Sequence, residues 1–231
     1  MSAAPFKLID SLLAGIRSHT RSPMTDPNYT ALLLVIDRSG SMITIRDEMV
    51  DALNGLLAEQ SALDGLLTVD VVIFDGVIEH THTMADARTV RIELEPRGGT
   101  ALMDALGASI QIFGQQLAAL PEHARPETVQ VIIVTDGHEN SSREYDHDMV
   151  RELITRQTEQ YNWDFVFLGA NQDAVLTARD LGIGRDSALT YDAGADGVRG
   201  MSRSTSRYMR DVRAKRKRGF DEGERGEARG A

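Results

Sequence analysis

The sequence predicts an α/β fold with three layers, in which helices cover both faces of a mostly parallel sheet. Short apolar runs rich in Val, Ile and Leu alternate along the chain with longer stretches whose apolar residues recur every three or four positions. The short runs are typical of strands buried on both faces, and the longer stretches are typical of amphipathic helices. Regular alternation of the two predicts an α/β/α sandwich, which binds ligands beyond the carboxyl ends of its strands.

The clearest strand covers residues 31–36, which are continuously apolar and lead into Asp-Arg-Ser-Gly-Ser. A second run, 67–74, is followed by Asp75-Gly76 and by a run, 77–83, that is polar at alternate positions. An Asp-Gly pair between two strand-forming runs predicts a hairpin, so we expect residues 77–83 to form an antiparallel edge strand. Further strands are predicted at 128–134, 165–168 and 188–190.

Helices are predicted wherever apolar residues share one helical face. Ser142 is the expected N-cap of the helix that follows strand 128–134. A short helix over 173–181 should end at Gly182, because glycine readily adopts the conformation that ends helices. The four longer faces are Ile45, Met49, Leu53, Leu56 and Leu57; Leu102, Leu106, Ile110, Phe113 and Leu117; Met149, Val150, Leu153 and Ile154; and Val198, Met201, Thr205, Tyr208, Met209 and Val212.

The 231 residues suit one domain, predicted at 27–214, with an appendage at each end. Residues 1–26 form an N-terminal extension, set off by a stretch containing two prolines. It is either flexible or an amphipathic helix packed on the domain, and Met24 is an alternative start to Met1. Residues 215–231 are charged and rich in Gly, Glu and Arg, which predicts a disordered tail. The apolar face of the extension is Phe6, Ile9, Leu12, Leu13 and Ile16, interrupted by Lys7, Asp10 and Arg17.

Composition excludes several classes of function. The absence of cysteine excludes disulfides, thiolate zinc sites and cysteine nucleophiles. Neither a signal peptide nor a membrane span is recognisable, so we expect a cytoplasmic protein without membrane contact. The net charge is −10, divided into −16 on residues 1–198 and +6 on residues 199–231. An acidic body argues against broad binding of nucleic acid and is compatible with a cation site.

Three segments carry oxygen donors at the ends of predicted elements. Asp37, Ser39 and Ser41 follow the first strand, Thr100 opens a helix, and Asp136 follows strand 128–134. Hard oxygen ligands of this kind suit Mg²⁺, with Mn²⁺ as a substitute. Two carboxylates that act through water would leave the cation electrophilic, so the site should accept one more anionic oxygen from outside.

The five residues Asp37, Ser39, Ser41, Thr100 and Asp136 resemble the metal-ion-dependent adhesion site of von Willebrand factor A domains. All five motif positions are filled, and the sequence looks most like short single-domain members from bacteria and phages. The resemblance covers roughly residues 28–212. The flanking sequences that also match are Leu34 to Met42, Gly98 to Leu102, and Val134 to Gly137.

The resemblance implies a Rossmann-like sandwich whose six-stranded sheet has one antiparallel edge strand. It further implies that the two serines, and sometimes the threonine, bind the metal directly, whereas the aspartates bind through water. The sixth coordination position would take a carboxylate of a partner protein. The first functional hypothesis is therefore a non-enzymatic, Mg²⁺-dependent protein-binding module.

Two other functions stay open. A metal-dependent hydrolase or phosphotransferase could use an oxygen-ligated Mg²⁺, but no Asp-x-Asp pair, phosphate loop or placed general base is recognisable. A nucleic-acid-associated protein could use the basic run on the C-terminal helix, although a solvated helix face explains such a run equally well. The run comprises Arg203, Arg207, Arg210, Arg213, Lys215, Arg216, Lys217 and Arg218. The partner, the native metal and the oligomeric state are not predicted.

Other polar residues near the motif have simpler interpretations. Asp75 is explained by its turn, and Asp104 is either a favourable charge in the first turn of a helix or a group that orients a metal ligand. The residues after Asp136 either border the metal face and contact the partner or simply form a solvated loop, which is the favoured interpretation: His138, Glu139 and Asn140. His80 and His82 share one face of the edge strand, where exposed histidines usually have no metal.

Overall fold

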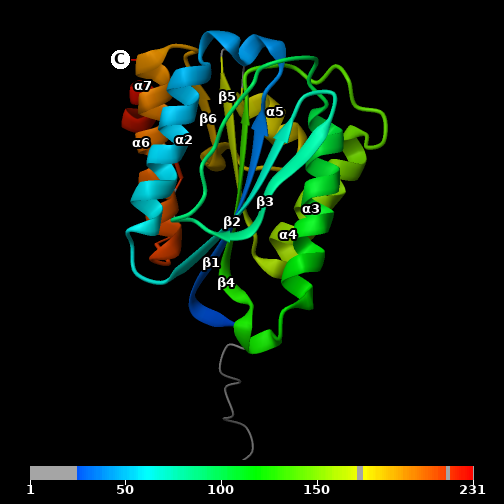
Figure 1. The fold of residues 1–231 in the computed structure, drawn as a ribbon, viewed down its shortest axis with the longest axis vertical. Coiled ribbons are helices and arrows are strands. Elements are labelled where there is room, and N and C mark those ends of the chain that lie inside the picture. Colours follow the sequence, from blue (N-terminus) through cyan, green and yellow to red (C-terminus); the bar gives the residue numbers. More distant parts are fainter. Residues whose placement is uncertain (1–24, 171–173, 217–218, 231) are drawn as a thin grey trace, which may run out of the picture.

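The computed structural model describes residues 25–170, 174–216 and 219–230, and it has the predicted three layers (Figure 1). The middle layer is a six-stranded sheet in the order β3-β2-β1-β4-β5-β6, in which β3 is antiparallel to β2 and the other neighbours are parallel. The strands are β1 (Asp26–Asp37), β2 (Leu66–Phe74), β3 (Ile78–Asp86), β4 (Pro126–Thr135), β5 (Asp164–Ala170) and β6 (Ala188–Tyr191). The predicted fold class is confirmed, including the antiparallel edge strand.

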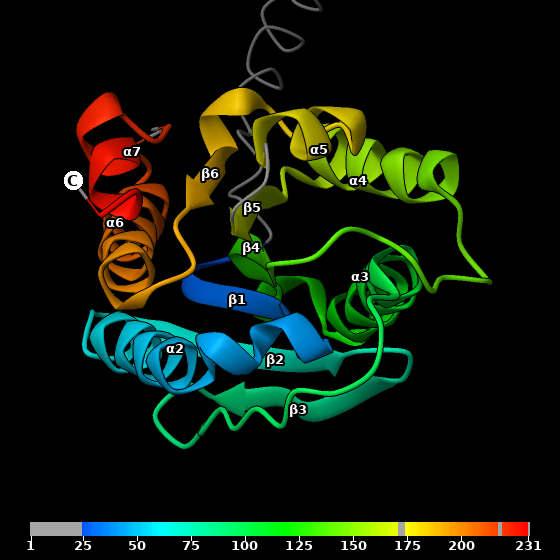
Figure 2. The ribbon, with the colours of Figure 1, turned by 90° about the horizontal axis from the view of Figure 1, so that it is seen from above.

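Helices cover both faces of the sheet, as the view from above shows (Figure 2). One face carries α2, α6 and α7, and the other carries α3, α4 and α5. The helices are α2 (Arg46–Ser61), α3 (Leu102–Ala119), α4 (His147–Tyr161), α5 (Ala174–Asp180), α6 (Ala195–Arg213) and α7 (Glu222–Ala228), and the short 3₁₀ helices are η1 (Gly40–Thr44), η2 (Glu122–Ala124) and η3 (Arg185–Ser187).

The central strand β1 shows why the sequence specifies two cores. Its side chains alternate between the faces, so that Leu32 and Leu34 join the core under α2 and α6 whereas Leu33 and Val35 join the core under α3 and α4. All four side chains are almost fully buried. A strand that is apolar on both faces is stable only between two helical layers, and this fixes β1 at the centre of the sheet.

The predicted hairpin at Asp75-Gly76 is present, and its second strand, β3, is partly exposed at the edge. The pairing of β2 with β3 shifts register, and Met84 has a positive φ of 43°. Asp70 of β2, which is almost fully buried, accepts a hydrogen bond of 2.8 Å from the Met84 backbone N–H. This carboxylate therefore stabilises the irregular end of the edge strand.

The prediction of a disordered tail is wrong for the described residues 219–230, because residues Glu222–Ala228 form helix α7 against α6. Asp221 and Glu224 form a capping box at its start, and the Phe220 ring stacks on Tyr208 with centroids 4.9 Å apart. The guanidinium of Arg225 donates to backbone carbonyls beside β6. The charged composition suggested a solvated tail, but these charges are paired within the fold.

The predicted N-cap of α4 is also wrong. Asp146 caps this helix by accepting a hydrogen bond of 2.9 Å from the Met149 N–H, and Ser142 lies in the preceding loop. Residues 1–24 of the predicted N-terminal extension lie outside the described residues. Within the described parts of the chain, no helix is long and apolar enough to cross a bilayer.

Candidate metal centre

The five predicted ligands lie at the carboxyl end of the sheet. Asp37 is the last residue of β1, and Asp136 directly follows β4, its neighbour in the sheet. The chain after Asp37 turns at once into η1, which carries Ser41. Adjacent parallel strands place their C-terminal loops side by side. The sheet order therefore brings Asp37 and Asp136 together, although Thr135, the last residue of β4, is 98 positions from Asp37 in the sequence.

Hydrogen bonds connect four of the five residues. The backbone N–H of Ser39 donates to Asp37 Oδ1 at 2.7 Å, and Ser39 Oγ lies 3.1 Å from Ser41 Oγ. Ser41 Oγ in turn donates to Asp136 Oδ1 at 2.7 Å. The two loops are thus joined through hydroxyl and carboxylate oxygens.

Gly137 shows that Thr100 belongs to the same cluster. A Cβ atom added to Gly137 would lie 3.0 Å from Thr100 Oγ1, 3.7 Å from Asp37 Oδ2 and 3.7 Å from Ser39 Oγ. Oxygens from the Thr100 segment and from the loop after β1 therefore surround one small space, which a side chain at Gly137 of the third segment would enter. The structure brings all five predicted residues together.

The carboxylates of Asp37 and Asp136 lie close together without a neutralising cationic side chain among the described residues. Burial raises the pKa of Asp37, and the neighbouring Asp136 carboxylate raises it further, while hydrogen bonds from Thr135 and Ser39 act in the opposite direction. Burial likewise raises the pKa of Asp136. Among the described residues, no Lys or Arg forms an ion pair with either carboxylate. A divalent cation would supply the missing positive charge, so the donor set fits such an ion.

No group of three or more His, Cys, Asp or Glu side chains that could hold a metal occurs in the part of the chain that the structure describes. The candidate centre has only two carboxylates and depends on the hydroxyls of Ser39, Ser41 and Thr100 for its other donors. An all-oxygen set of this kind matches a hard cation and excludes a thiolate or imidazole site.

A charge cluster beside the centre was not predicted. Arg38 is buried and donates to Asp75 at 3.0 Å and to Glu79 at 2.9 and 2.7 Å. Arg97 donates to the same two carboxylates, at 2.8 Å to Asp75 and 3.1 Å to Glu79. We call Arg38, Asp75, Glu79 and Arg97 the arginine–carboxylate cluster. The sequence explained Asp75 by its turn alone. The one feature that pointed to a charge cluster was the position of Arg38 next to the motif residue Asp37.

The arginine–carboxylate cluster ties the Thr100 segment to the loop after β1. The Arg97 N–H donates to the Arg38 carbonyl at 2.8 Å, and the Gly40 N–H donates to the Gly98 carbonyl at 3.2 Å. The Ala101 N–H donates to the Asp75 carbonyl at 3.0 Å. Side-chain and backbone bonds therefore act together to place Thr100 opposite Asp37.

The loop after Asp136 holds Thr100 from the other side. Asn140 exchanges two hydrogen bonds with the Thr100 backbone, at 2.9 and 3.0 Å, and Glu139 accepts from the Met103 N–H at the start of α3. Asp104 accepts from the backbone N–H groups of Arg143, Glu144 and Tyr145. Asp104 is therefore a loop anchor, a role that neither sequence interpretation included, and Asn140 positions a predicted ligand.

Most cations of the basic run are engaged within the domain. Arg207 pairs with Glu224 and Glu227, each at 3.0 Å, and Lys215 pairs with Glu127 at 3.2 Å. Arg213 donates to backbone carbonyls of the chain around the end of α2, and Arg216 pairs with Asp211. Lys217 and Arg218 lie outside the described residues. The run is thus largely a means of packing α6 against its neighbours.

No protein-family model matches the sequence, and no match is found among curated proteins. Solved structures of the same fold do match. The von Willebrand factor domain of the type V pili tip protein Mfa5 from Porphyromonas gingivalis is 10% identical, with a TM-score of 0.58 over 84% of this chain and 98% of that one. The manganese-loaded TRAP protein of Plasmodium vivax is 20% identical, with a TM-score of 0.52 over 73% and 70% of the two chains.

Proximal thread matrix protein 1 of the mussel byssus is 16% identical, with a TM-score of 0.54 over 81% of this chain. The chain spans less than half of the mussel protein, 46% of its length. These similarities define the class: the chain has the fold of a von Willebrand factor A domain, as its motif residues predicted.

Proposed function

We propose that this chain is a protein-binding module that depends on a divalent cation. Mg²⁺, with Mn²⁺ as a substitute, would be held by Asp37, Ser39, Ser41, Thr100 and Asp136. The observation that carries the proposal is the convergence of Thr100 Oγ1, Asp37 Oδ2 and Ser39 Oγ around the space beside Gly137. The manganese-loaded structure of TRAP, which has the same fold, supports the binding of a divalent cation.

The partner would contribute a carboxylate. The protein supplies two carboxylates, and hydroxyls add dipoles without charge, so a bound cation would retain affinity for a further anionic oxygen. The centre lies at the rim of the sheet, where Ser41 is exposed and the nearby Ile43 side chain is 68% exposed. An acidic side chain of a protein can reach this rim, and an apolar neighbour of that acid would meet Ile43.

We further propose that the module is not an enzyme. The one cationic side chain inside the motif, Arg38, is turned toward Asp75 and Glu79, where it cannot polarise a substrate at the centre. Turnover of a generic phosphoester by the purified protein, lost in Asp37→Asn, would contradict this part of the proposal.

Calorimetric titration with Mg²⁺ and with Mn²⁺ tests the metal site directly. We expect one binding event in the wild type and none in Thr100→Ala, because this change removes a hydroxyl donor without adding bulk. Thr83→Ala, at an exposed position of β3, is the matched control and should bind like the wild type. Equal binding by Thr100→Ala would remove Thr100 from the ligand set.

Partner binding is tested by affinity capture from source lysate in Mg²⁺ and in EDTA. The proposal expects a protein retained only with Mg²⁺ and lost in Asp37→Ala, while circular dichroism shows that the variant is folded. Retention that is equal in EDTA would contradict a metal-dependent contact.

A further inference from the structure

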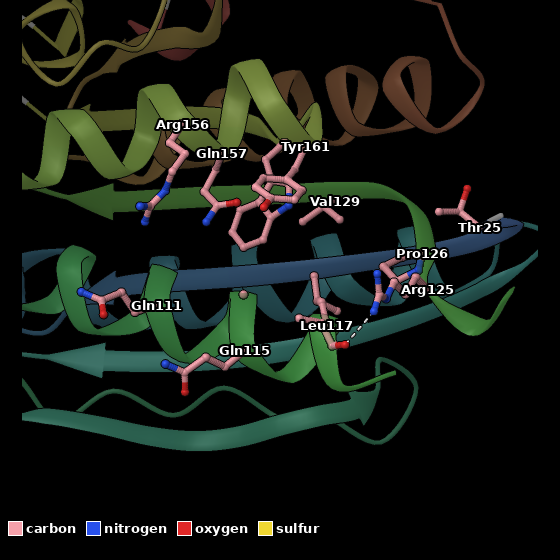
Figure 3. A pocket seen from close by; sticks show the side chains of 13 residues that line it. Thr25, Gln111, Gln115, Leu117, Arg125, Pro126, Val129, Arg156, Gln157 and Tyr161 are labelled. Atoms are coloured by element: carbon pink, nitrogen blue, oxygen red, sulfur yellow. Dashed lines mark hydrogen bonds between the residues drawn. The ribbon is translucent and has the colours of Figure 1, made fainter. Parts of the chain in front are cut away.

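A cavity of about 520 Å³ opens between α3 and α4 at the amino-terminal end of the sheet, opposite the metal centre (Figure 3). We call it the α3–α4 groove. Its size is within the range of about 300–1,000 Å³ that is usual for ligand-binding sites. The apolar side chains that line it come from α3, the start of β4, the end of α4 and the link from α4 to β5: Leu117, Pro126, Val129, Tyr161 and Trp163.

The groove presents one large aromatic side chain that the described residues leave mostly uncovered. Tyr161 is 62% exposed at the rim, whereas Trp163 and Leu117 are each 6% exposed and already belong to the core. Gly114 of α3 lies beside the Trp163 indole, since a Cβ added to it would lie 3.7 Å from Trp163 Cη2. Burial of the Tyr161 ring by another segment would be stabilising.

The described chain begins inside this groove. Thr25 is among its lining residues, and the preceding 24 residues are joined directly to it. In that stretch Phe6, Ile9, Leu13 and Ile16 recur at helical spacing, which favours an amphipathic helix. We propose that residues 1–24 dock in the α3–α4 groove of their own chain, with this apolar face against Tyr161 and the Gly114 side of α3.

The lengths are compatible. From Phe6 to Ile16 a helix would extend about 15 Å, and the α3 residues that line the groove, Gln111 to Ala118, extend about 10 Å. The nine residues from Ile16 to Thr25 can span up to about 30 Å when extended. The segment can therefore turn back and lie along the groove without stretching the connection.

Disulfide trapping tests the proposal in the full chain, which has no cysteine of its own. Single cysteines at Phe6, Ile9, Leu13 or Ile16 are combined with Gln115→Cys on the exposed rim of α3. Because a disulfide requires Cα atoms within about 7 Å, we expect an intrachain disulfide for one or two of these pairs. The same four cysteines combined with Ala58→Cys, exposed on α2 on the opposite face of the sheet, should form none.

Filling the groove is the complementary test. Gly114→Met places a flexible side chain in the groove beside Trp163 and should reduce the trapped fraction several-fold, whereas Gly55→Met, at an open position of α2, should leave it unchanged. Both changes replace a helical glycine, so their effects on helix stability are matched.

Intrachain trapping with Gln115→Cys that Gly114→Met suppresses supports the proposal. Disulfides that form only between chains would assign the segment to a second copy and overturn it. Trapping no greater than in the Ala58→Cys controls at all four positions would also overturn it. Neither result depends on metal binding, so the proposed function is tested separately.

Discussion

Asp70 is an ionisable residue inside a mostly apolar strand, where its burial is unfavourable but its carboxylate accepts a backbone hydrogen bond. Burial raises the pKa of its carboxyl group, although hydrogen bonds from Met84 and Gln116 and the nearby His80 oppose the shift. The ionised form is therefore less stable in the folded protein than in the unfolded chain. What the carboxylate contributes in return is an acceptor for the Met84 backbone at the irregular end of β3.

Asp70→Asn should change how stability depends on pH. An acid whose folded pKa is raised favours folding at low pH, and this contribution is lost as pH rises from the ordinary value of about 3.9 to the raised folded value. Asparagine does not titrate, and its Oδ1 can still accept from Met84. We expect the variant to lack a slope of up to about 1.4 kcal/mol per pH unit in that window.

Urea unfolding of the wild type and Asp70→Asn across pH 4 to 7 measures this difference, and the other titrating groups cancel between the two proteins. Parallel curves for the two proteins would show that Asp70 keeps its ordinary pKa in the fold.

At the scale of elements, the centre depends on how loops are held more than on the ligands themselves. Thr100 lies between the arginine–carboxylate cluster on one side and Asn140 on the other. Both groups hold the chain around Thr100 by hydrogen bonds and so restrict where the Thr100 hydroxyl lies. Residues that orient metal ligands in this way typically make a large contribution to metal affinity.

Arg97→Ala should therefore weaken Mg²⁺ binding although Arg97 is not a predicted ligand. We expect a loss of about 10–100-fold in affinity, as for other residues that orient ligands. Arg88→Ala, which removes an exposed arginine with one long contact to Asp86, is the control and should have no effect. Calorimetric titration measures both, and wild-type affinity in Arg97→Ala would show that the backbone bonds alone place Thr100.

Helix α7 depends on a close approach to α6. A Cβ added to Gly200 of α6 would overlap the backbone carbonyl of Glu227, whereas one added to Gly226 of α7 would meet nothing within 4 Å. Gly200→Ala should lower the free energy of unfolding by about 1–3 kcal/mol or more, because neither backbone can yield. Gly226→Ala should be neutral or stabilising, since alanine favours a helix. Equal stability of the two variants in urea unfolding would mean that α7 contributes little to the fold.

For the whole molecule, the centre couples metal binding to stability. Two carboxylates with raised pKa values, Asp37 and Asp136, lie together without a protein cation, so the fold without metal carries an unfavourable charge arrangement. A ligand that binds only the folded state stabilises it by mass action, by about 2.7 kcal/mol at a concentration of 100 times its Kd.

Mg²⁺ should raise the melting temperature of the wild type and leave that of Asp136→Asn unchanged. Without metal, the variant should be at least as stable as the wild type, because one of two like charges is removed while its oxygen can still accept from Ser41. Calorimetry with Mg²⁺ and with EDTA measures the melting temperatures of the wild type and of Asp136→Asn in both conditions. A full Mg²⁺ increment in Asp136→Asn would place the cation elsewhere.

Local sequence patterns are sufficient for the strands, the long helices, the Asp75-Gly76 hairpin and the five oxygen donors. Each of these depends on side-chain alternation, helical spacing or turn chemistry over a few residues, and the resemblance to von Willebrand factor A domains implied the same six strands and grouped the five donors as one metal site. The same patterns cannot reveal pairings between distant residues. The packing of helix α7 on α6 and the arginine–carboxylate cluster follow from contacts that no local spacing records, whereas the α4 cap at Asp146 is a local contact with Met149 that the choice of Ser142 missed.

The two kinds of feature differ in predictability for a physical reason. The composition of a charged, glycine-rich segment predicts a solvated tail, because it does not show which cations pair with which anions, as Arg207 does with Glu224 and Glu227. Likewise, the sequence around Asp75 predicts only a turn residue, and it does not show that Arg38 and Arg97 from separate loops both pair with this carboxylate. Burial of apolar residues is periodic and hence visible in the chain, whereas the choice of ionic and hydrogen-bond partners depends on where the sheet order places each loop.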